Sequence, residues 1–236
     1  MADRFNILLV GHGRLGQLIA AAAPQAGATI AGTIDDTNAG DLADRARWRN
    51  VDVAIDASAP DAFVANLPAL CALGCSLVVG TTGWQAHAAD VRRQIDAAGI
   101  GAVVSANFSV GATLMDALTE RAAKLFAPQD LYGAFVHETH HAAKKDAPSG
   151  TALAMRHALR EGLGADVPVT SVRTGHVPGT HELTFDGPFE QITLAHMARD
   201  RRVFADGALT AAEWLRGRQG VFTMADVLGL PGGSHP

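Results

Sequence analysis

Short apolar runs alternate with longer amphipathic segments over the first hundred residues. The run FNILLV, residues 5–10, is continuously apolar, as is typical of a strand covered on both faces. Similar runs occupy residues 28–34, 51–56, 75–80 and 100–106, and helical patterns occupy residues 14–26, 60–73 and 85–98. Strand, helix and strand at this spacing predict an α/β fold with a Rossmann-type, doubly wound parallel sheet.

The pattern changes after residue 108. A long helix is expected over residues 109–126, where Leu114, Leu118, Ala122 and Leu125 form an apolar stripe. Further strands are expected at residues 131–138, 167–173, 181–187 and 190–196, with a helix at 151–163 that ends at the glycines Gly162 and Gly164. Turn residues between the later strands predict that part of their sheet is antiparallel. These elements predict a second, smaller α+β domain with a mixed sheet, and the last forty residues return to helix.

Composition and charge narrow the function classes. Of the 236 residues, 48% are hydrophobic and 18% are charged, which allows a substantial core. The net charge of -5 argues against nucleic acid as a partner. No apolar run reaches the roughly 18 residues of a membrane span, so no membrane partner is expected. The N-terminus lacks a signal-peptide layout, and Cys71 and Cys75 are expected to be free thiols, so we expect a cytoplasmic protein.

A glycine-rich loop follows the first strand and opens the first helix. The segment GHGRLG has G-x-G-x-x-G spacing, in which the glycines permit a tight turn, close approach of a pyrophosphate and close helix packing. Phosphates there meet free N–H groups and the positive end of the helix dipole. We therefore predict dinucleotide binding rather than an unliganded turn. The cofactor-binding residues expected in this loop are Gly11, Gly13, Arg14, Leu15 and Gly16.

The end of the second expected strand bears on which nicotinamide cofactor binds. Asp35 lies near the spacing at which a carboxylate binds the adenine ribose hydroxyls. Asp36 follows, with no arginine immediately after it, so two carboxylates would repel a 2′-phosphate. The sequence predicts NADH as the preferred cofactor over NADPH. Two features leave this open: Arg14 could reach the extra phosphate, and Asp36 could be a solvated loop carboxylate.

The segment VHETHHAAKKDAPSG contains the pattern H-E-x-x-H, which is typical of zinc metalloproteases. A zinc protease needs His137 and His141 on one face of a helix, with the glutamate aimed at a bound water. The residues before the motif are β-branched, aromatic and small, and they predict a strand instead. We expect no metal, although a loop could still gather these histidines.

The same segment fits an anion and proton site better. His140, His141, Lys144 and Lys145 bring cationic groups together, and a histidine poised near neutrality is a good proton donor. Pro148 ends any preceding helix, and Ser149, Gly150 and Thr151 open a new one whose first N–H groups favour a carboxylate. A small dicarboxylate substrate would suit this site. The alternative is a polar surface loop with solvated lysines.

Five blocks of the sequence together resemble one known family. GRLG, GTTGW, SANFSVG, ETHHAAKKDAPSGTAL and RRVFADGALTAAEWL resemble the dihydrodipicolinate reductases of bacterial lysine and diaminopimelate biosynthesis, also called 4-hydroxy-tetrahydrodipicolinate reductases. The blocks extend from Gly13 to Leu215, nearly the whole chain. The histidine–lysine block is highly specific to that family, whereas the glycine loop alone is not.

The resemblance implies a role for each matching residue. His140 matches the general acid, and Lys144 matches the lysine that holds a substrate carboxylate and is tied to catalysis. Substrate contacts are implied for His141, Gly150, Thr151 and Thr82, and cofactor contacts for Gly80, Thr81, Thr82, Ala106, Asn107 and Phe108. Hydride would pass to the ring C4 after loss of the 4-hydroxyl, and the enamine-type intermediate would take a proton from His140 to give tetrahydrodipicolinate.

The resemblance also implies a domain division and an oligomer. Residues 1–108 and 202–236 would bind the dinucleotide, and residues 109–201 would bind substrate and make oligomer contacts. Two departures from the family pattern stand out: the glycine loop begins one residue shorter than in many members, and the second domain lacks about a strand pair before HVPGTHELTFDG. A homotetramer is expected, with a dimer as the alternative.

Two other functions remain possible from the sequence. The chain could be another nicotinamide-dependent dehydrogenase acting on a small carboxylate, since a fold does not fix its chemistry. It could also be a non-catalytic module that binds NADH as a signal. The doubled histidine with its lysines and the helix-opening PSGT argue against both.

Overall fold

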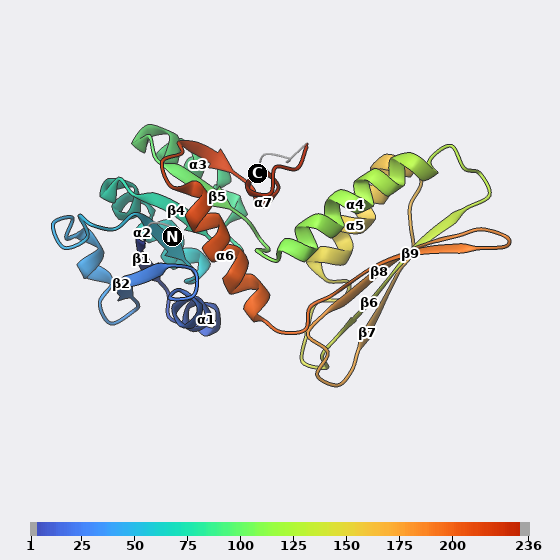
Figure 1. Cartoon of the computed structure of the whole chain (residues 1–236), viewed down its shortest axis with the longest axis horizontal. Helices are drawn as coiled ribbons and strands as arrows, with labels where there is room; N and C mark the ends of the chain where they lie inside the picture. Colours follow the sequence, from blue (N-terminus) through green and yellow to red (C-terminus); the bar gives the residue numbers. More distant parts are fainter. Residues whose placement is uncertain (1–3, 232–236) are drawn as a thin grey trace. The chain divides into compact units, whose positions relative to one another are not determined.

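The computed structural model describes residues 4–231, and the chain divides into two compact units. Unit 1 comprises Met1–Val110 and Arg202–Pro236, and unit 2 comprises Gly111–Arg201. Figure 1 shows both units coloured along the sequence. Residues 1–3 and 232–236, which fall in the expected dinucleotide-binding domain, lie outside the described residues.

Unit 1 is built on a parallel sheet, as predicted. Within residues 4–231 the sheet has six strands in the order β10-β5-β4-β3-β1-β2, and each neighbouring pair runs parallel. The strands are β1 (Phe5–Val10), β2 (Ala28–Ile34), β3 (Val53–Asp56), β4 (Ser76–Val79), β5 (Gly101–Val104) and β10 (Gly220–Phe222). The pattern predicted the first five, whereas β10 is only three residues long and gave no strand signal of its own.

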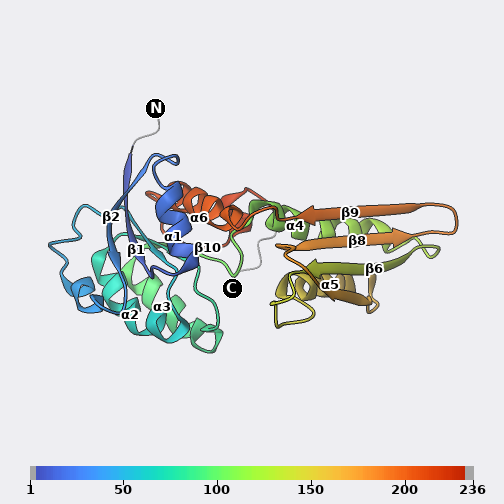
Figure 2. The same ribbon diagram turned by 90° about the horizontal axis from the view of Figure 1, so that it is seen from below.

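Helices cover both faces of this sheet (Figure 2). One face packs against α1 (Arg14–Ala22), α6 (Arg202–Leu215) and α7 (Met224–Val227), and the other against α2 (Pro60–Leu73) and α3 (Ala88–Ala98). Two 3₁₀ turns, η1 (Ala39–Ala43) and η2 (Gln85–His87), complete the unit. The α1 helix ends at Ala22 rather than near residue 26. Ala23 still has helical dihedral angles, but Pro24 has no N–H to continue the helical hydrogen bonds.

The strand order has a topological switch point between β1 and β3. From β1 the chain first adds β2 on one side and later crosses to add β3, β4 and β5 on the other. Ligands of doubly wound folds bind outside the carboxyl ends of the strands at such a point. The glycine loop directly follows β1 and therefore lies there.

Unit 2 is a mixed sheet with two helices on one face (Figure 1). Its sheet, within the described residues, has the order β7-β6-β8-β9, where β6–β7 is parallel and the other two pairs are antiparallel. The elements are α4 (Val110–Phe126), β6 (Gly133–His140), α5 (Gly150–Leu163), β7 (Val169–Arg173), β8 (Thr180–Asp186) and β9 (Gln191–Met197). Val136, Leu183 and Phe185 of the sheet pack against Met115 of α4 and Met155 and Leu159 of α5.

The long helix is present as predicted, but its apolar stripe is not its buried face. Leu114, Leu118 and Leu125 are exposed, and the buried positions are Ala112, Met115, Thr119 and Ala123. The two helices approach closely where Ala123 of α4 faces Gly162 of α5, since a Cβ added at Gly162 would collide with Ala123.

The end of α5 also differs from expectation in one detail. Gly162 lies inside the helix, where the contact with Ala123 requires its lack of a side chain. Gly164 alone forms the C-cap, with a left-handed φ of 71°. At the other end Ser149 is the N-cap, and its hydroxyl accepts a hydrogen bond from Ala152 N, as the PSGT segment predicted.

Among the described residues, the search for a helix long and apolar enough to span a bilayer found none.

Candidate active site

The glycine loop has the geometry that its spacing predicted. Gly11 has a φ of 94°, and a Cβ there would collide with the backbone carbonyl of Ala57. A Cβ at Gly16 would collide with the carbonyl oxygen of Gly11. Gly13, the N-cap of α1, is exposed, and a Cβ there would meet no atom within 4 Å. Two glycines are therefore required by packing, and the third leaves open backbone at the helix N-terminus, where a pyrophosphate would bind.

Asp35 directly follows β2, beside the glycine loop. Gly11 N donates to Ile34 O at 2.8 Å, which joins the two segments. The Asp35 carboxylate accepts hydrogen bonds from the hydroxyl and the backbone N–H of Thr37, and these bonds lower its pKa. The side chain is therefore an anion at neutral pH. Arg14 and Asp36 are both exposed.

Residues from three separate loops pack together in unit 1. A Cβ placed on Gly80 would lie 3.4 Å from Phe108 Cε2 and 3.6 Å from Leu15 Cδ2. Gly80 follows β4, Phe108 follows β5, and Leu15 lies in the first turn of α1. The structure thus brings together residues that were predicted separately. Asn107 stabilises its own turn, since its side-chain oxygen accepts a hydrogen bond from Ser109 N. Thr82, which follows the Gly80 turn, and Ala106, which precedes Asn107, are both exposed.

Asp56 is a buried acid in this region that the sequence analysis did not single out. It ends β3, is fully buried, and accepts hydrogen bonds from the hydroxyls of Thr81 and Ser58. Burial raises the pKa of its carboxyl despite those bonds. Because Gly80 N also donates to Asp56 O, the end of β3 holds the Gly80–Thr82 loop in place. An acid closing an apolar strand, as in VDVAID, was the available signal.

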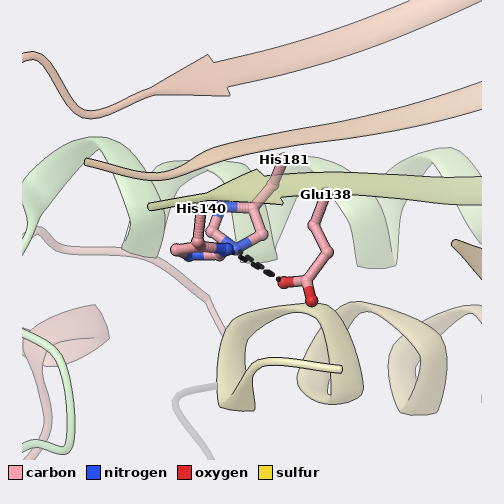
Figure 3. A group of neighbouring side chains, drawn as sticks. All are labelled: Glu138, His140 and His181. Atoms are coloured by element: carbon pink, nitrogen blue, oxygen red, sulfur yellow. Dashed lines mark ion pairs between the residues drawn. The ribbon is translucent and has the colours of Figure 1, made fainter. Parts of the chain in front are cut away.

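A second group of polar residues crosses the sheet of unit 2. Glu138 and His140 alternate along β6 and share the face that packs on the helices. Glu138 lies directly opposite His181 of β8 and next to Ser171 of β7, and His140 lies next to Arg173. Figure 3 shows the Glu138 carboxylate pointing toward both imidazoles. Three adjacent strands therefore deliver this polar cluster to one place.

Glu138 is fully buried, yet it is held as an anion. Its Oε1 accepts from Ser149 N at 2.9 Å, Ser171 Oγ at 2.7 Å and Arg173 Nη2 at 2.7 Å. Burial by itself raises the pKa of this carboxyl, but the hydrogen bonds from Ser149, Arg173 and Ser171 outweigh it and lower the pKa to about 2. The bond to Ser149 N also ties the sheet to the start of α5.

The two imidazoles near Glu138 differ in their surroundings. Glu138 Oε2 lies 3.5 Å from His140 Nδ1 and 3.6 Å from His181 Nε2. Burial lowers the pKa of His181 to about 4, with a further contribution from the nearby His140, so His181 is neutral at pH 7. Burial also lowers the pKa of His140, while Glu138 acts in the opposite direction.

The loop after β6 presents the remaining predicted substrate residues. Lys144 Nζ donates to both oxygens of Asp146, at 2.8 and 2.9 Å. Arg173 braces this loop by donating to the carbonyl oxygen of Asp146 as well as to Glu138. The partly buried Thr151 and the exposed Gly150 belong to the first turn of α5, whose N–H groups have no partner inside the helix. His141 follows directly on β6 and is partly buried.

The side chains of Glu138, His140 and His181 have the donor atoms that zinc prefers, and those atoms lie within 4.8 Å of one another. Residues 137–140 are part of strand β6, as predicted, so this segment does not form the helical H-E-x-x-H arrangement that a zinc protease needs. One carboxylate oxygen already binds the Arg173 guanidinium, and Lys144 adds a second positive charge nearby. These charges disfavour a cation, so the arrangement fits a hydrogen-bonded cluster better than a metal centre.

Three members of this cluster, Glu138, Arg173 and His181, are not recognisable as site residues from the sequence. Glu138 was noticed only as part of a protease motif, and Arg173 and His181 lie far from the histidine–lysine block in sequence. No local pattern marks them, because only strand pairing brings residues 138, 173 and 181 together. Glu138 follows Ala134 and Val136 in alternation on the inward face of β6, so an acid at a core-facing position was the usable signal.

Comparison with known proteins gives a family. A model described as "Dihydrodipicolinate reductase, N-terminus" matches residues 5–108, and one described as "Dihydrodipicolinate reductase, C-terminus" matches residues 111–228. The chain belongs to the dihydrodipicolinate reductase family. A relative from Acidiphilium cryptum, named 4-hydroxy-tetrahydrodipicolinate reductase, is 40% identical over 92% of this chain and 94% of its own. One of the same name from Gluconobacter oxydans is 41% identical over 92% and 93%.

Solved structures agree with the fold of this family. A dipicolinate-bound dihydrodipicolinate reductase from Paenisporosarcina sp. TG-14 matches with a TM-score of 0.78 at 20% identity, over 94% of this chain and 98% of that one. An apo scyllo-inositol dehydrogenase from Lactobacillus casei matches with a TM-score of 0.57 at 11% identity, over 97% and 93%. Since other dehydrogenases share the fold, the family rests on the sequence matches.

Proposed function

We propose that this protein reduces 4-hydroxy-tetrahydrodipicolinate, by way of dihydrodipicolinate, to tetrahydrodipicolinate in lysine and diaminopimelate biosynthesis, with NADH or NADPH as the reductant. The observation that carries the proposal is the cluster of His140, Lys144 and the α5 N-terminus, which the family's specific block builds in unit 2. Relatives about 40% identical over nearly their whole length carry the name of this activity.

Unit 2 supplies what a small dicarboxylate needs. Lys144 offers a primary ammonium group, and the first turn of α5 offers backbone N–H groups at the positive end of a helix dipole. Asp146 neutralises Lys144 in the structure, so a substrate carboxylate would share or replace that partner. The solved relative with dipicolinate bound shows that a member of this fold takes a planar dicarboxylate. We assign substrate binding to His141, Lys144, Gly150 and Thr151 of unit 2, and also to Thr82 of unit 1.

Unit 1 supplies what a dinucleotide needs. The open backbone at Gly13 and the anionic Asp35 fit a pyrophosphate and a ribose, respectively. We assign cofactor binding to residues of four loops: Gly11, Gly13, Arg14, Leu15, Gly16, Asp35, Gly80, Thr81, Thr82, Ala106, Asn107 and Phe108. The bound dihydronicotinamide supplies a hydride to C4 of the ring, after the 4-hydroxyl has left as water.

His140 donates the proton that the reaction needs. Hydride addition to the conjugated ring leaves an enamine-type carbon that needs one proton for the product to form. The His140 imidazolium donates it and becomes neutral imidazole, so the balanced change is one hydride and one proton added. The nearby Lys144 holds the carboxylate that is attached to the reacting ring. A dicarboxylate also raises the pKa of His140 by bringing negative charge beside it, which favours the protonated form needed.

A coupled assay tests the proposal. The substrate is made in situ by the synthase that precedes this step, and oxidation of NADH is followed by its absorbance. Turnover that depends on the synthase product supports the function. A panel of amino-acid, sugar and small-carboxylate substrates supplies the contrary outcome: turnover there, and none with the synthase product, would indicate a different dehydrogenase. Tight NADH binding without any turnover would indicate a sensing module.

We propose that NADH is preferred over NADPH. The Asp35 carboxylate is ionised and lies beside the glycine loop, where it would bind ribose hydroxyls and repel a 2′-phosphate. We expect kcat/KM to be higher with NADH, and Asp35→Ser to lower the NADH value by about tenfold, as for loss of a hydrogen bond to a charged group. Asp36→Ser is the matched control for a solvated carboxylate. A tenfold preference for NADPH in the unmodified protein would contradict this proposal.

We also propose a homo-oligomer, with a tetramer expected and a dimer as the alternative. The face of the unit 2 sheet opposite α4 and α5 carries exposed Phe135, Val172 and Met197. Apolar side chains gathered on an open sheet face favour association. Light scattering should give four times the 24.5 kDa mass of one chain, and Met197→Glu should lower the value. A single-chain mass at micromolar concentration would contradict the proposal.

A further inference from the structure

We propose that Glu138 is a positioning residue: its Oε2 accepts the Nδ1–H of His140, so that His140 Nε2 is the atom that delivers the proton to the substrate. This inference rests on the proposed function only for the final transfer step. The hydrogen bond itself is a property of the protein without substrate, and it can be tested separately.

The main evidence is a pair of buried polar atoms that face each other. Within the described residues, Glu138 Oε2 and His140 Nδ1 are both buried and neither has a conventional hydrogen-bond partner. They lie 3.5 Å apart (Figure 3). A buried donor or acceptor without a partner is costly, and a small closure of this gap would satisfy both atoms at once. A carboxylate can only accept, so the proton must be on Nδ1.

The two oxygens of Glu138 have separate tasks. Oε1 accepts from Ser149 N, Ser171 Oγ and Arg173 Nη2, which locks the carboxylate to α5 and to β7. With Oε1 engaged on the scaffold, Oε2 is left pointing at the imidazoles. The carboxylate is thereby fixed relative to both the proton donor and the helix N-terminus proposed to bind the substrate. A residue that only stabilised the sheet would not require this division.

Gly179 lies close to the other ring nitrogen of His140. A Cβ placed on Gly179 would lie 3.0 Å from His140 Nε2, and Gly179 has a positive φ of 156°. A side chain at this position would press on the nitrogen. The lack of a side chain at Gly179 therefore avoids a clash with Nε2, while Nδ1 faces the Glu138 carboxylate.

Every charged or titratable group around His140 affects its protonation. Arg173 of β7 and Lys144 of the following loop lower the pKa of His140, and Glu138 and Asp146 raise it. His181 of β8 lies opposite His196 of the neighbouring strand β9, and burial lowers the pKa of both imidazoles. With its neighbouring imidazoles neutral, His140 is the histidine of this group that the Glu138 charge can support as a cation.

The first experiment reads the proton directly. In ¹⁵N spectra of histidine-labelled protein without ligands, the two ring nitrogens of a neutral imidazole have well separated shifts that depend on which one carries hydrogen. The His140 signals are assigned by their absence in His140→Gln. We expect the hydrogen on Nδ1 in the neutral form. A neutral His140 with its hydrogen on Nε2 would overturn the proposal, whatever the enzyme's activity proves to be.

The second experiment is the pH dependence of Glu138→Gln, which keeps the size of the side chain and removes its charge. We expect kcat to fall by about 10- to 100-fold, the size seen when outer partners of a functional histidine are removed, with little change in KM for NADH. Since Glu138 raises the pKa of His140, its loss lowers that pKa. The deficit should therefore be largest at high pH and shrink as the pH falls.

Matched variants separate positioning from general damage. Asp166→Asn makes the same carboxylate-to-amide change at an exposed residue that accepts hydrogen bonds from Arg156, and we expect normal kinetics. Ser171→Ala removes one donor to Oε1 while leaving Oε2 and the charge, and should cost much less than Glu138→Gln. A Glu138→Gln deficit of the same size at every pH, or one matched by Ser171→Ala, would overturn the proposal. If Glu138→Gln does not fold, the spectra of the unmodified protein still decide it.

Discussion

Replacing His140 with glutamine lowers kcat by about 10²- to 10⁴-fold, the usual contribution of a general acid. Glutamine keeps a polar group of similar reach but cannot deliver a proton at neutral pH. Because His140 lies in unit 2 and the proposed cofactor residues lie in unit 1, KM for NADH should change little. The measurement is steady-state kinetics in the coupled assay, with thermal melting as a check on folding.

The matched control is His137→Gln, three residues earlier on the same strand. His137 lies on the opposite face of β6, where its Nε2 contacts Thr139 Oγ1 at 3.2 Å, so its loss should leave kcat nearly unchanged. The unmodified enzyme should also lose kcat/KM as the pH rises through the pKa of His140, which burial holds below 6.5 in the free protein. Wild-type turnover by His140→Gln would remove His140 from the mechanism.

Replacing Lys144 with alanine raises KM for the dicarboxylate substrate by about 10- to 100-fold, the loss expected for a hydrogen bond between charged groups. The rate also falls, because a loosely held carboxylate no longer fixes the ring beside His140. Dipicolinate offers a second measurement that needs no turnover: its dissociation constant should rise by a similar factor. The change also frees Asp146 from its partner, which adds repulsion against an incoming carboxylate.

Lys145→Ala is the matched control for this prediction. It removes the same charge one residue further along the same loop, from an exposed side chain. The two variants have equal net charge, so a difference in their KM for the substrate reflects the position of the lysine rather than the overall charge of the protein. Equal losses in both would mean that the loop attracts the dicarboxylate only through its general positive charge, and Lys144 would lose its assigned role.

Much of the fold could be predicted because it depends on local sequence patterns, namely apolar runs and glycine spacing. Continuous apolar runs mark strands covered on both faces, and β1 to β5 were recognised in this way. The G-x-G-x-x-G spacing placed the glycine loop at a strand-to-helix turn, where Gly11 does take a positive φ. The pattern failed where packing overrides periodicity. On α4 the buried face holds Ala112, Met115, Thr119 and Ala123 rather than the leucine stripe, and Ala123 meets Gly162 of α5 where only small residues fit.

Only part of the candidate site could be predicted from the sequence, because local patterns do not reveal contacts between distant residues. His140, Lys144, Gly150 and Thr151 lie within twelve residues, so a specific block of sequence names them together. The residues that surround them do not lie in that block. Glu138, Arg173 and His181 come from three strands that are distant in sequence and meet only through strand pairing. Asp56, which holds the Thr81 loop, is likewise separated from its partner by 25 residues.

The sequence by itself determined the family, the order of the elements and the residues proposed to carry the chemistry. Local propensity, glycine spacing and one compact block of histidines and lysines are sufficient for those conclusions. Only the tertiary structure decided which groups surround the proposed proton donor. The buried Glu138 carboxylate remains charged because donors from β7 and from the N-terminus of α5 converge on it, and only strand pairing and helix packing bring those donors together.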